Sequence, residues 1–274
     1  MHLDPLAADL PARTAAVARR LERLGLGVTV ETGARYVLDP RRKHGPSLLD
    51  PDAEARATRT RFLLRAVRVA ADLGAHALHC FSGITPPATS DATAWKRLTE
   101  SLTPVLEAAS AARVPLAVEP EPGHLLATLD DFHHLRGLLG DPAPDVLGLT
   151  LDLGHCQCLE PLPPADCVRA AAPWIRHIQI EDMRRGVHEH LPFGDGEIDF
   201  PPLLDALTAL AAGGYPDGAQ EEPGAGGAGL GVRVEEGGAV LAARVEDVAG
   251  AGLDGDAEAE PLQPARDGGG AGGK

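Results

Sequence analysis

Short aliphatic runs alternate with longer segments of helical periodicity along the first 215 residues, and this alternation limits the fold more than any other feature. The runs predict strands at residues 27–31, 76–80, 116–119, 148–152 and 175–180. The segments between them predict helices at residues 12–24, 53–73, 91–112, 128–139, 165–171 and 201–212. Most runs are apolar on both faces, as strands buried in a parallel sheet are. The sequence therefore predicts an α/β fold of repeated βα units.

The composition changes after residue 215. Residues 216–274 contain 16 of the 32 glycines, no aromatic residue, and 12 acidic against four basic residues. Such a segment buries too few large apolar side chains to offset the entropy lost when its backbone is ordered. We therefore predict a folded domain over residues 1–215 and a low-complexity tail over residues 216–274 that is mostly disordered. Within the tail, a short strand at 231–234 or a helix at 240–248 is compatible with the pattern.

Charge and hydropathy exclude several classes of partner. The chain has 40 acidic and 25 basic residues, and its net charge of −15 disfavours a nucleic-acid backbone or an anionic bilayer. No stretch approaches the roughly 18 uncharged apolar residues of a membrane-spanning helix, and the N-terminus lacks the apolar core of a signal peptide. Four cysteines at uneven spacing form no disulfide framework. We therefore expect a cytoplasmic protein that binds neither nucleic acid nor a membrane.

Polar residues follow the carboxyl ends of the predicted strands. Glu119 ends one strand before a proline, and Asp152 ends the next, three residues before His155. The following strand contributes Gln179 from a polar face, and His190 lies in the loop that follows. Taken singly, these residues also fit solvated acids, helix caps or core histidines. Because ligands gather at the carboxyl ends of parallel strands, their shared location favours a site for a transition-metal cation.

Four successive segments read V-E-P-E-P-G, L-D-L-G-H-C, H-I-Q-I-E-D-M and H-L-P-F-G-D-G-E-I-D-F. They resemble the sugar phosphate isomerase/epimerase family, whose fold is a xylose-isomerase-like TIM barrel, over about residues 1–215. The resemblance implies a divalent metal (manganese, cobalt, zinc or magnesium) at the top of a (β/α)8 barrel. It implies metal ligands at Glu119, Asp152 and Gln179, where Gln179 replaces the usual histidine and His177 or His190 would compensate. It also implies substrate contacts at His155, Asp182 and Arg185.

The resemblance further implies proton transfer between adjacent carbons of a sugar or sugar phosphate through an enediolate, with Glu119 and Glu222 as the acid–base groups. A non-catalytic, metal-binding remnant of the same fold is the first alternative. A phosphodiesterase like the related apurinic endonuclease is less favoured, because the acidic chain offers no cationic groove.

The barrel is expected to be incomplete. The family has two more strands before the segment at residues 2–5, and an eighth strand bearing a Glu after Tyr215, where Glu222 is the nearest match in register. A sheet of five strands cannot close, so it leaves exposed edges that a second copy could cover in a homo-oligomer. A truncated start and a shifted reading frame after Tyr215 are our hypotheses for these differences.

Overall fold

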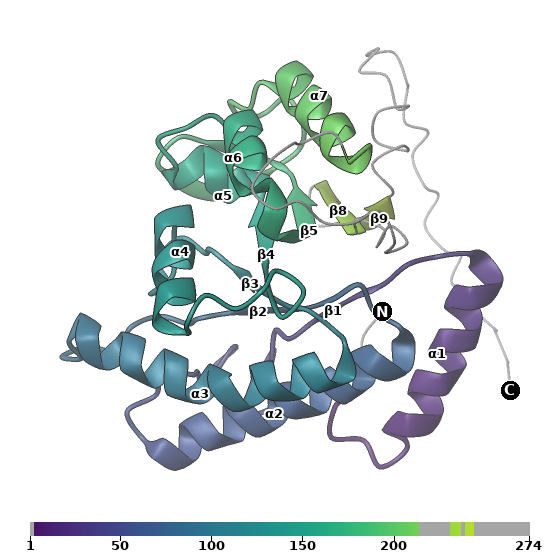
Figure 1. The fold of residues 1–274 in the computed structure, drawn as a ribbon, viewed down its shortest axis with the longest axis vertical. Helices are drawn as coiled ribbons and strands as arrows, with labels where there is room; N and C mark the ends of the chain where they lie inside the picture. Colours follow the sequence, from purple (N-terminus) through teal and green to yellow (C-terminus); the bar gives the residue numbers. More distant parts are fainter. Residues whose placement is uncertain (1–2, 214–230, 237–238, 244–274) are drawn as a thin grey trace, which may run out of the picture.

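The computed structural model describes residues 3–213, 231–236 and 239–243. Its main sheet has the strand order β1-β2-β3-β4-β5-β8-β9 (Figure 1). Strands β1 to β5 are parallel and span Thr29–Glu31, Ala77–Phe81, Leu116–Glu119, Leu147–Asp152 and Ile175–Ile180. Strand β8 (Gly231–Glu236) continues the sheet parallel to β5, and β9 (Ala239–Ala243) pairs with β8 in the antiparallel direction. This is a TIM-barrel-like α/β fold that stays open, as predicted.

All six predicted helices form, each within two residues of the predicted ends. They are α1 (Leu10–Leu24), α2 (Ala53–Leu73), α3 (Asp91–Ala112), α4 (Leu129–Leu138), α6 (Pro164–Ala171) and α7 (Phe200–Ala211). The sequence missed α5 (Leu153–Leu159), which starts directly at the end of β4, and a 3-10 turn at Ala172–Trp174. Local capping explains the accuracy: Asp52 caps α2, Ser90 caps α3, and Thr128 and Asp131 form a capping box on α4.

Two secondary-structure predictions, a loop and a helix, need correction. The predicted loop after β5 contains an antiparallel hairpin of β6 (Asp182–Arg184) and β7 (Val187–Leu191), because Gly186 adopts a positive φ of 72° at the turn. The helix considered at 240–248 is wrong over residues 240–243, which belong to β9, whereas the short strand at 231–234 is confirmed as part of β8. The rest of the predicted tail, including Glu222, lies outside the described residues.

The two faces of the sheet differ in chemistry, which corrects the prediction that the strands are apolar on both faces. Alternate residues of β2 to β5 pack into the hydrophobic core beneath the helices: Leu78, Cys80, Leu116, Val118, Leu149, Leu151, Ile178 and Ile180. The residues between them are buried and mostly polar: His79, Glu119, Thr150, Asp152, His177 and Gln179. Both faces of these strands are shielded from water, so burial does not distinguish the apolar face from the polar one.

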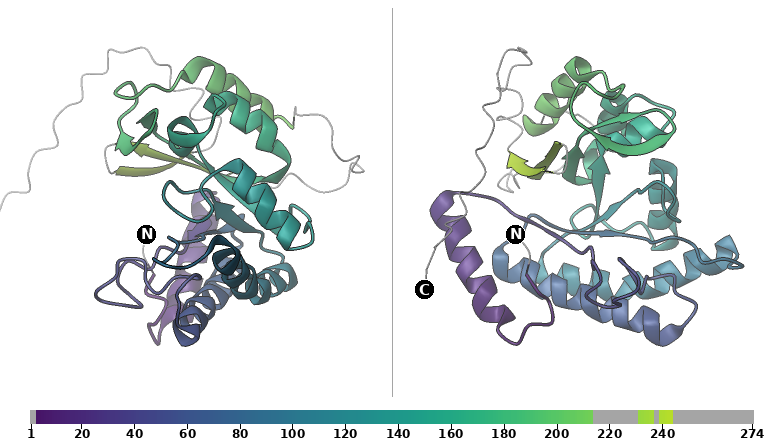
Figure 2. Two further views of the ribbon diagram at one scale, coloured as in Figure 1. Left: turned by 90° about the vertical axis from the view of Figure 1, so that its left-hand side faces the viewer. Right: turned by 180° about the vertical axis from the view of Figure 1, so that it is seen from behind.

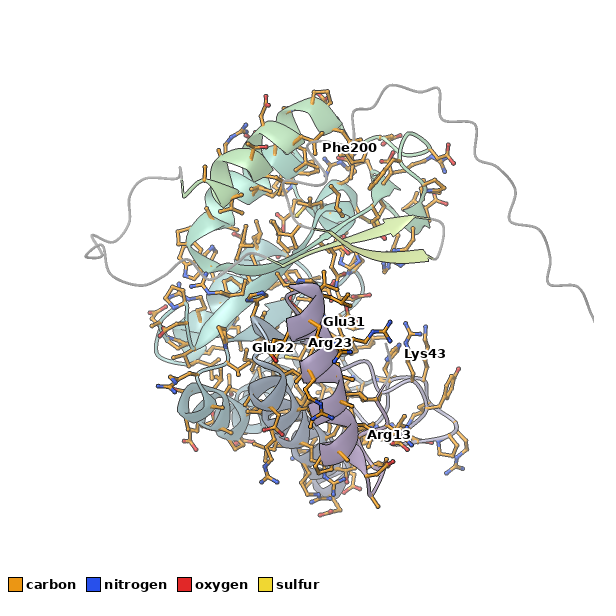
Figure 3. The ribbon with its side chains drawn as sticks, turned by 90° about the vertical axis from the view of Figure 1, so that its right-hand side faces the viewer. Arg13, Glu22, Arg23, Glu31, Lys43 and Phe200 are labelled. Carbon is orange, nitrogen blue, oxygen red and sulfur yellow. The ribbon has the colours of Figure 1, made fainter. Side chains whose placement is uncertain are left out.

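The helices cover the outside of the curved sheet. Helices α2 and α3 lie together at one end of the sheet, and α5, α6 and α7 lie at the other end (Figures 1 and 2). Helix α1 stands at the side of the molecule, with Arg13, Glu22 and Arg23 along it (Figure 3), and Thr14 is its only buried residue. Strands β1 and β9 are the edges of the sheet within the described residues, so the barrel remains open there.

None of the helices that the structure describes combines the length and the apolar character needed to cross a bilayer.

Candidate metal and substrate site

Three strand ends bring their polar side chains together. Glu119 on β3, Asp152 on β4 and Gln179 on β5 are all buried, with Glu119 only 3% exposed. Ligand atoms of Glu119, Asp152 and His155 lie within 4.8 Å of one another, an arrangement able to hold a cation. Parallel pairing explains the convergence, because Asp152 and Gln179 are register partners and their strands end at the same edge.

The amide of Gln179 shows how closely these groups approach. One of its terminal atoms lies 3.2 Å from Glu119 Oε1 and 3.0 Å from Asp152 Oδ2. With the amide nitrogen in this position, Gln179 donates to both carboxylates. With the amide oxygen there, three oxygens meet, and their repulsion is offset by a bound cation or by a proton on Asp152. The donor set therefore fits a divalent cation, and an amide flip is the alternative in its absence.

His79 is a member of the site that the sequence did not reveal. Its Nε2 hydrogen-bonds to Glu119 Oε2, and both side chains are buried. Burial alone would raise the pKa of Glu119, but the charge and hydrogen bond of His79, followed by the charge of His155, hold this pKa at about 2. Glu119 is therefore a carboxylate at neutral pH. The sequence did contain a signal for this role, because a histidine two residues before the end of an aliphatic strand is unusual in a hydrophobic core.

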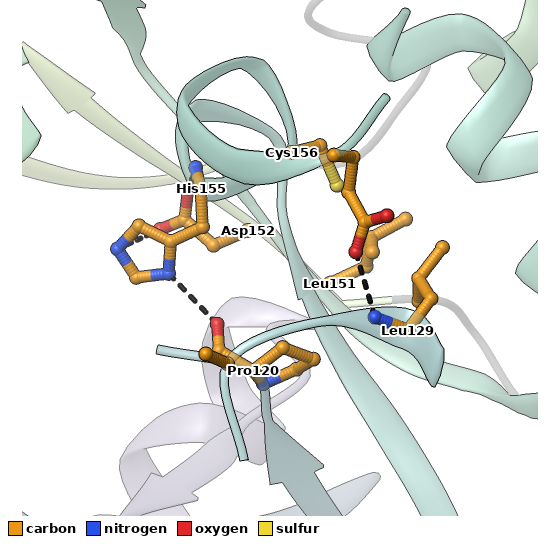
Figure 4. A pocket seen from close by; sticks show the side chains of 8 residues that line it. Pro120, Leu129, Leu151, Asp152, His155 and Cys156 are labelled. Atoms are coloured by element: carbon orange, nitrogen blue, oxygen red, sulfur yellow. Dashed lines mark hydrogen bonds and ion pairs between the residues drawn. The ribbon is translucent and has the colours of Figure 1, made fainter. Parts of the chain in front are cut away.

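His155 lies between the two carboxylates. Its Nδ1 is 3.0 Å from the Pro120 carbonyl oxygen and 3.5 Å from Glu119 Oε1. Its buried Nε2 makes no hydrogen bond and lies 3.9 Å from Asp152 Oδ2 (Figure 4). Burial lowers its pKa, but the charges of Asp152 and Glu119 outweigh burial and raise the pKa to about 9. Burial raises the pKa of Asp152 to about 7 against the attraction of His155, with help from the charge of Glu181.

The D-x-x-H pattern has two roles at once. Asp152 Oδ1 accepts a hydrogen bond from the backbone N–H of His155 at 3.0 Å and thereby caps α5. The helix cap, which the sequence analysis kept as an alternative interpretation, is therefore confirmed. The other carboxylate oxygen of Asp152 faces Gln179. The cap thus fixes the side chain of Asp152 while leaving one oxygen for the cluster. Asp152 and His155 also line the hollow drawn in Figure 4, together with Leu129, Leu151 and Cys156.

The hairpin of β6 and β7 adds two histidines beside the cluster. The rings of His188 and His155 have centroids 4.9 Å apart, and those of His190 and His188 are 5.4 Å apart. His188 Nε2 lies 4.0 Å from Glu121 Oε1, and Glu121, His155 and His188 form a second group of close donors. His190 belongs to neither group of donors: its Nδ1 lies 2.5 Å from Glu181 Oε2. The structure therefore does not bring His190 into the Glu119 cluster.

Asp182, for which the resemblance implies a substrate contact, accepts four backbone hydrogen bonds. Its Oδ2 accepts from the N–H groups of Gly194 and Gly196, both at 2.9 Å, and its Oδ1 accepts from Met183 and Ile198 at 2.9 and 3.1 Å. A side chain on Gly196 would collide with the Asp182 carboxylate, which explains the glycine there. Asp182 therefore holds the loop that follows β7 against β6.

Arg185 is exposed at the hairpin turn. Its guanidinium donates to the backbone carbonyl of Glu160, and its backbone N–H donates to Glu197 Oε2 at 3.0 Å. The arginine thus ties the hairpin to the end of α5. Among the described residues, the Asp182 carboxylate is not part of the group of close ligand atoms formed by Glu119, Asp152 and His155. Glu222 lies outside the described residues, so the structure does not place it relative to the cluster.

Fold and cluster together define an open β/α barrel with acidic, imidazole and amide groups gathered at the carboxyl ends of its strands. The chain belongs to the xylose isomerase-like TIM barrel family, whose match covers residues 2–215. This confirms the resemblance found in the four sequence segments. No protein of curated function matches the sequence.

Solved structures of sugar epimerases share the fold. An L-ribulose 3-epimerase has a TM-score of 0.60 and 26% identity, over 76% of this chain and 65% of that protein. The 3-keto-D-glucoside 4-epimerase of E. coli has a TM-score of 0.60 and 18% identity, over 73% of each chain. A family 2 AP endonuclease from Brucella melitensis has a TM-score of 0.58 and 19% identity, over 72% and 73%. The fold is therefore that of sugar isomerases and epimerases, and an AP endonuclease shares it.

Proposed function

We propose that this protein is a divalent-metal-dependent isomerase or epimerase of a sugar or sugar phosphate. The observation that carries the proposal is the meeting of Glu119, Asp152 and Gln179, where one terminal amide atom of Gln179 lies 3.2 Å from Glu119 Oε1 and 3.0 Å from Asp152 Oδ2. Buried oxygens at such distances need either donated hydrogens or a cation. The similarity to an L-ribulose 3-epimerase supports a sugar as the substrate.

The residues of the cluster suit a hard or borderline divalent cation. Glu119 and Asp152 would supply carboxylate oxygens and Gln179 an amide oxygen, and these are ligands that manganese, magnesium and cobalt accept. When bound, the cation would supply Lewis acidity that favours ionisation of a substrate hydroxyl beside a carbonyl.

Side chains of the protein would transfer the proton and bind the substrate. Glu119 is ionised and held at Oε2 by His79, so it is prepared to accept a proton from a carbon next to the carbonyl. His155 presents a buried Nε2 without a hydrogen-bond partner, which would bind a substrate hydroxyl. The polar inner face of β2 to β5 holds these groups in a largely water-free setting, where hydrogen bonds orient the substrate strongly.

Solvent exchange tests the proposed reaction. We expect the purified protein with manganese or cobalt to incorporate deuterium from heavy water into one member of a panel of ketoses, aldoses and their phosphates. Metal content should be near one ion per chain and should fall in Glu119→Gln and Asp152→Asn. Absence of exchange across the panel in the metal-loaded protein would refute the reaction.

A metal-binding remnant without activity is the second candidate. Within the described residues no strand pairs with the outer edge of β1, and this favours the remnant, because a closed barrel requires a further strand along that edge. This candidate shares the metal binding but predicts no exchange with any substrate, and the same panel therefore separates the two functions.

Metal binding and pH should be linked in melting experiments. The pKa of Asp152 is raised to about 7 and that of His155 to about 9, so both groups hold protons more tightly in the folded state. Their contribution to stability is complete below their unfolded pKa values and is lost as pH rises through the folded values. We expect the Tm of the metal-free protein to fall from about pH 5 to about pH 9. Glu119, with its pKa of about 2, titrates below this window.

Manganese should counteract the fall in Tm with rising pH, because a cation binds ionised Asp152. The increase in Tm that manganese causes is therefore expected to grow with pH over the same window. Thermal melting with manganese and with EDTA at several pH values measures both slopes. A manganese shift that stays constant with pH would contradict Asp152 as a ligand.

Replacing Gln179, the amide in the position of the family's histidine ligand, tests whether metal affinity can be increased. Gln179→His removes the ambiguity of the amide and places an imidazole nitrogen next to Glu119 and Asp152. We expect affinity for zinc or cobalt to rise by about tenfold, because imidazole is a better ligand for these metals than a neutral amide. Isothermal titration of the metal-free protein measures the change, with magnesium as the control that should not improve.

A further inference from the structure

We propose that the substrate carries a phosphate group and that a basic subsite on the loop between β1 and α2 binds it. The basic subsite consists of Arg35, Lys43 and His44 on this loop, together with the buried Arg59 on α2. This inference rests on the proposed function and narrows its substrate class from a sugar to a sugar phosphate. It adds residues that lie outside the cluster of Glu119.

One aromatic ring connects the basic subsite to the acidic cluster. Phe81 is the register partner of Glu119, so the two side chains lie next to each other on the inner face of the sheet. The His44 ring meets the Phe81 ring edge-on, with centroids 5.5 Å apart, and the His124 ring lies 5.2 Å from it. Both histidines are partly exposed. A substrate bound at the cluster would therefore extend across Phe81 and place its phosphate beside His44.

The charges that act on His44 are positive. Burial lowers the pKa of His44, and the charges of Lys43, Arg59 and Arg35 lower it further. Arg35 and Lys43 are exposed, as Figure 3 shows for Lys43, and neither forms an ion pair in the part of the chain that the structure describes. Like charges that gather without an acid repel one another, and a bound anion would remove this repulsion.

The other cations of the loop already have acidic partners. Arg42 Nε lies 2.7 Å from Asp39 Oδ2, and Arg42 Nη1 lies 2.8 Å from Asp50 Oδ2. Arg41 Nε lies 4.0 Å from the other oxygen of Asp39. The carboxylates of the loop are thus paired with two consecutive arginines, and the charges of Arg35 and Lys43 remain available for a ligand.

Arg59 is a buried cation without a carboxylate partner. It is 1% exposed, its Nη2 donates to the Thr32 carbonyl oxygen at 2.9 Å, and its Nη1 has no hydrogen-bond partner. Its guanidinium carbon lies 5.5 Å from the centre of the Phe81 ring. Burial lowers its pKa to about 10, so it remains charged at neutral pH. A buried charge without a counter-ion is costly, and a phosphate beside Phe81 would offset this cost.

The backbone keeps Arg35 and Lys43 close to each other. The N–H of Tyr36 donates to the carbonyl oxygen of Lys43 at 2.8 Å and closes the loop between them. Arg35 and Tyr36 have positive φ angles of 44° and 69°, which residues with a side chain rarely adopt. Such costly conformations concentrate at sites that hold ligands. Two full charges beside an imidazole match a phosphate dianion better than a singly charged carboxylate.

Binding of inorganic phosphate tests the basic subsite without requiring catalysis. Calorimetric titration in EDTA at constant ionic strength keeps phosphate away from any bound metal. We expect Lys43→Gln and Arg35→Gln each to weaken phosphate binding about tenfold, because each removes a charged hydrogen-bond donor. Arg41→Gln is the matched control, since it removes an equal charge from a side chain that is 91% exposed on the same loop. It should change the affinity less than about twofold, and acetate should bind more weakly than phosphate.

Deuterium exchange tests whether the substrate uses the subsite. With manganese bound, we expect a higher kcat/KM for a phosphorylated sugar than for its unphosphorylated counterpart. Lys43→Gln should reduce this preference about tenfold, mainly through KM. A wild type that binds no phosphate, or that prefers the unphosphorylated sugar, would overturn the inference, as would an equal loss of phosphate affinity in Arg41→Gln and Lys43→Gln. Absence of exchange with every sugar, together with weaker phosphate binding in Lys43→Gln alone, would refute the proposed function and support the phosphate site.

Discussion

Glu119→Gln is expected to lower turnover by about 10³-fold or more, the largest effect of any single substitution in this chain. The substitution keeps the shape of the side chain but removes the carboxylate that would accept the proton. It also places a second amide against Gln179 and His79, where donors then face donors. The loss should therefore appear both in deuterium exchange and in the affinity for manganese.

The measurement needs saturating metal, so that weaker binding is not mistaken for lost chemistry. Exchange rates at saturating manganese report the proton transfer, and a titration of the metal-free protein reports the ligand role. Glu107→Gln, at an exposed position on α3, is the matched control and should behave as the wild type. More than about a tenth of wild-type exchange in metal-saturated Glu119→Gln would exclude this carboxylate as the base.

Asp182→Ala should destabilise the protein by about 3 kcal/mol, the largest expected stability effect, because four backbone N–H groups lose their charged acceptor. The side chain is 1% exposed, so water cannot replace it without opening the loop. The effect is a loss of the tie between β6 and the segment from Gly194 to Ile198.

Urea denaturation gives the free energy of unfolding for the wild type and the variant. Asp182→Asn is expected to lose less, because the amide keeps one acceptor oxygen. Asp195→Ala in the same loop is the control: that residue is exposed, and its backbone N–H and carbonyl bond to Pro192 and Arg184. A change below about 0.5 kcal/mol in Asp182→Ala, the range of ordinary surface substitutions, would show that water replaces the carboxylate.

Local features explain why the helices and the five parallel strands could be predicted. The caps at Asp52, Ser90 and Thr128 and the left-handed Gly74 act within a few residues, so the sequence signals them directly. The D-x-x-H segment is equally local, because Asp152 caps the helix that begins beside it. The hairpin was missed because its residues are polar and short of β-branched side chains, and its glycine turn resembles any loop.

The residues of the candidate site also fall into two groups, those that the sequence indicates and those that only the fold reveals. Glu119, Asp152 and Gln179 could be named from the sequence, because parallel strands place their carboxyl ends at one edge whatever the exact packing. His79 could not, since a lone histidine in an aliphatic strand reads as part of the core until β2 pairs with β3 beside Glu119. The resemblance implies a substrate contact for Asp182, whereas its four backbone hydrogen bonds could not be predicted, because their partners lie up to 16 residues away in the chain.

The amino-acid order alone determined the succession of βα units and the strand ends on which the acids lie, because helix caps, turns and aliphatic runs act over short distances. The tertiary structure decided which polar groups meet: His79 with Glu119, His190 with Glu181, and Asp182 with its loop. Such pairings depend on how strands and loops pack across the sheet. A local sequence pattern cannot predict them, because the packing of distant segments determines which residues meet.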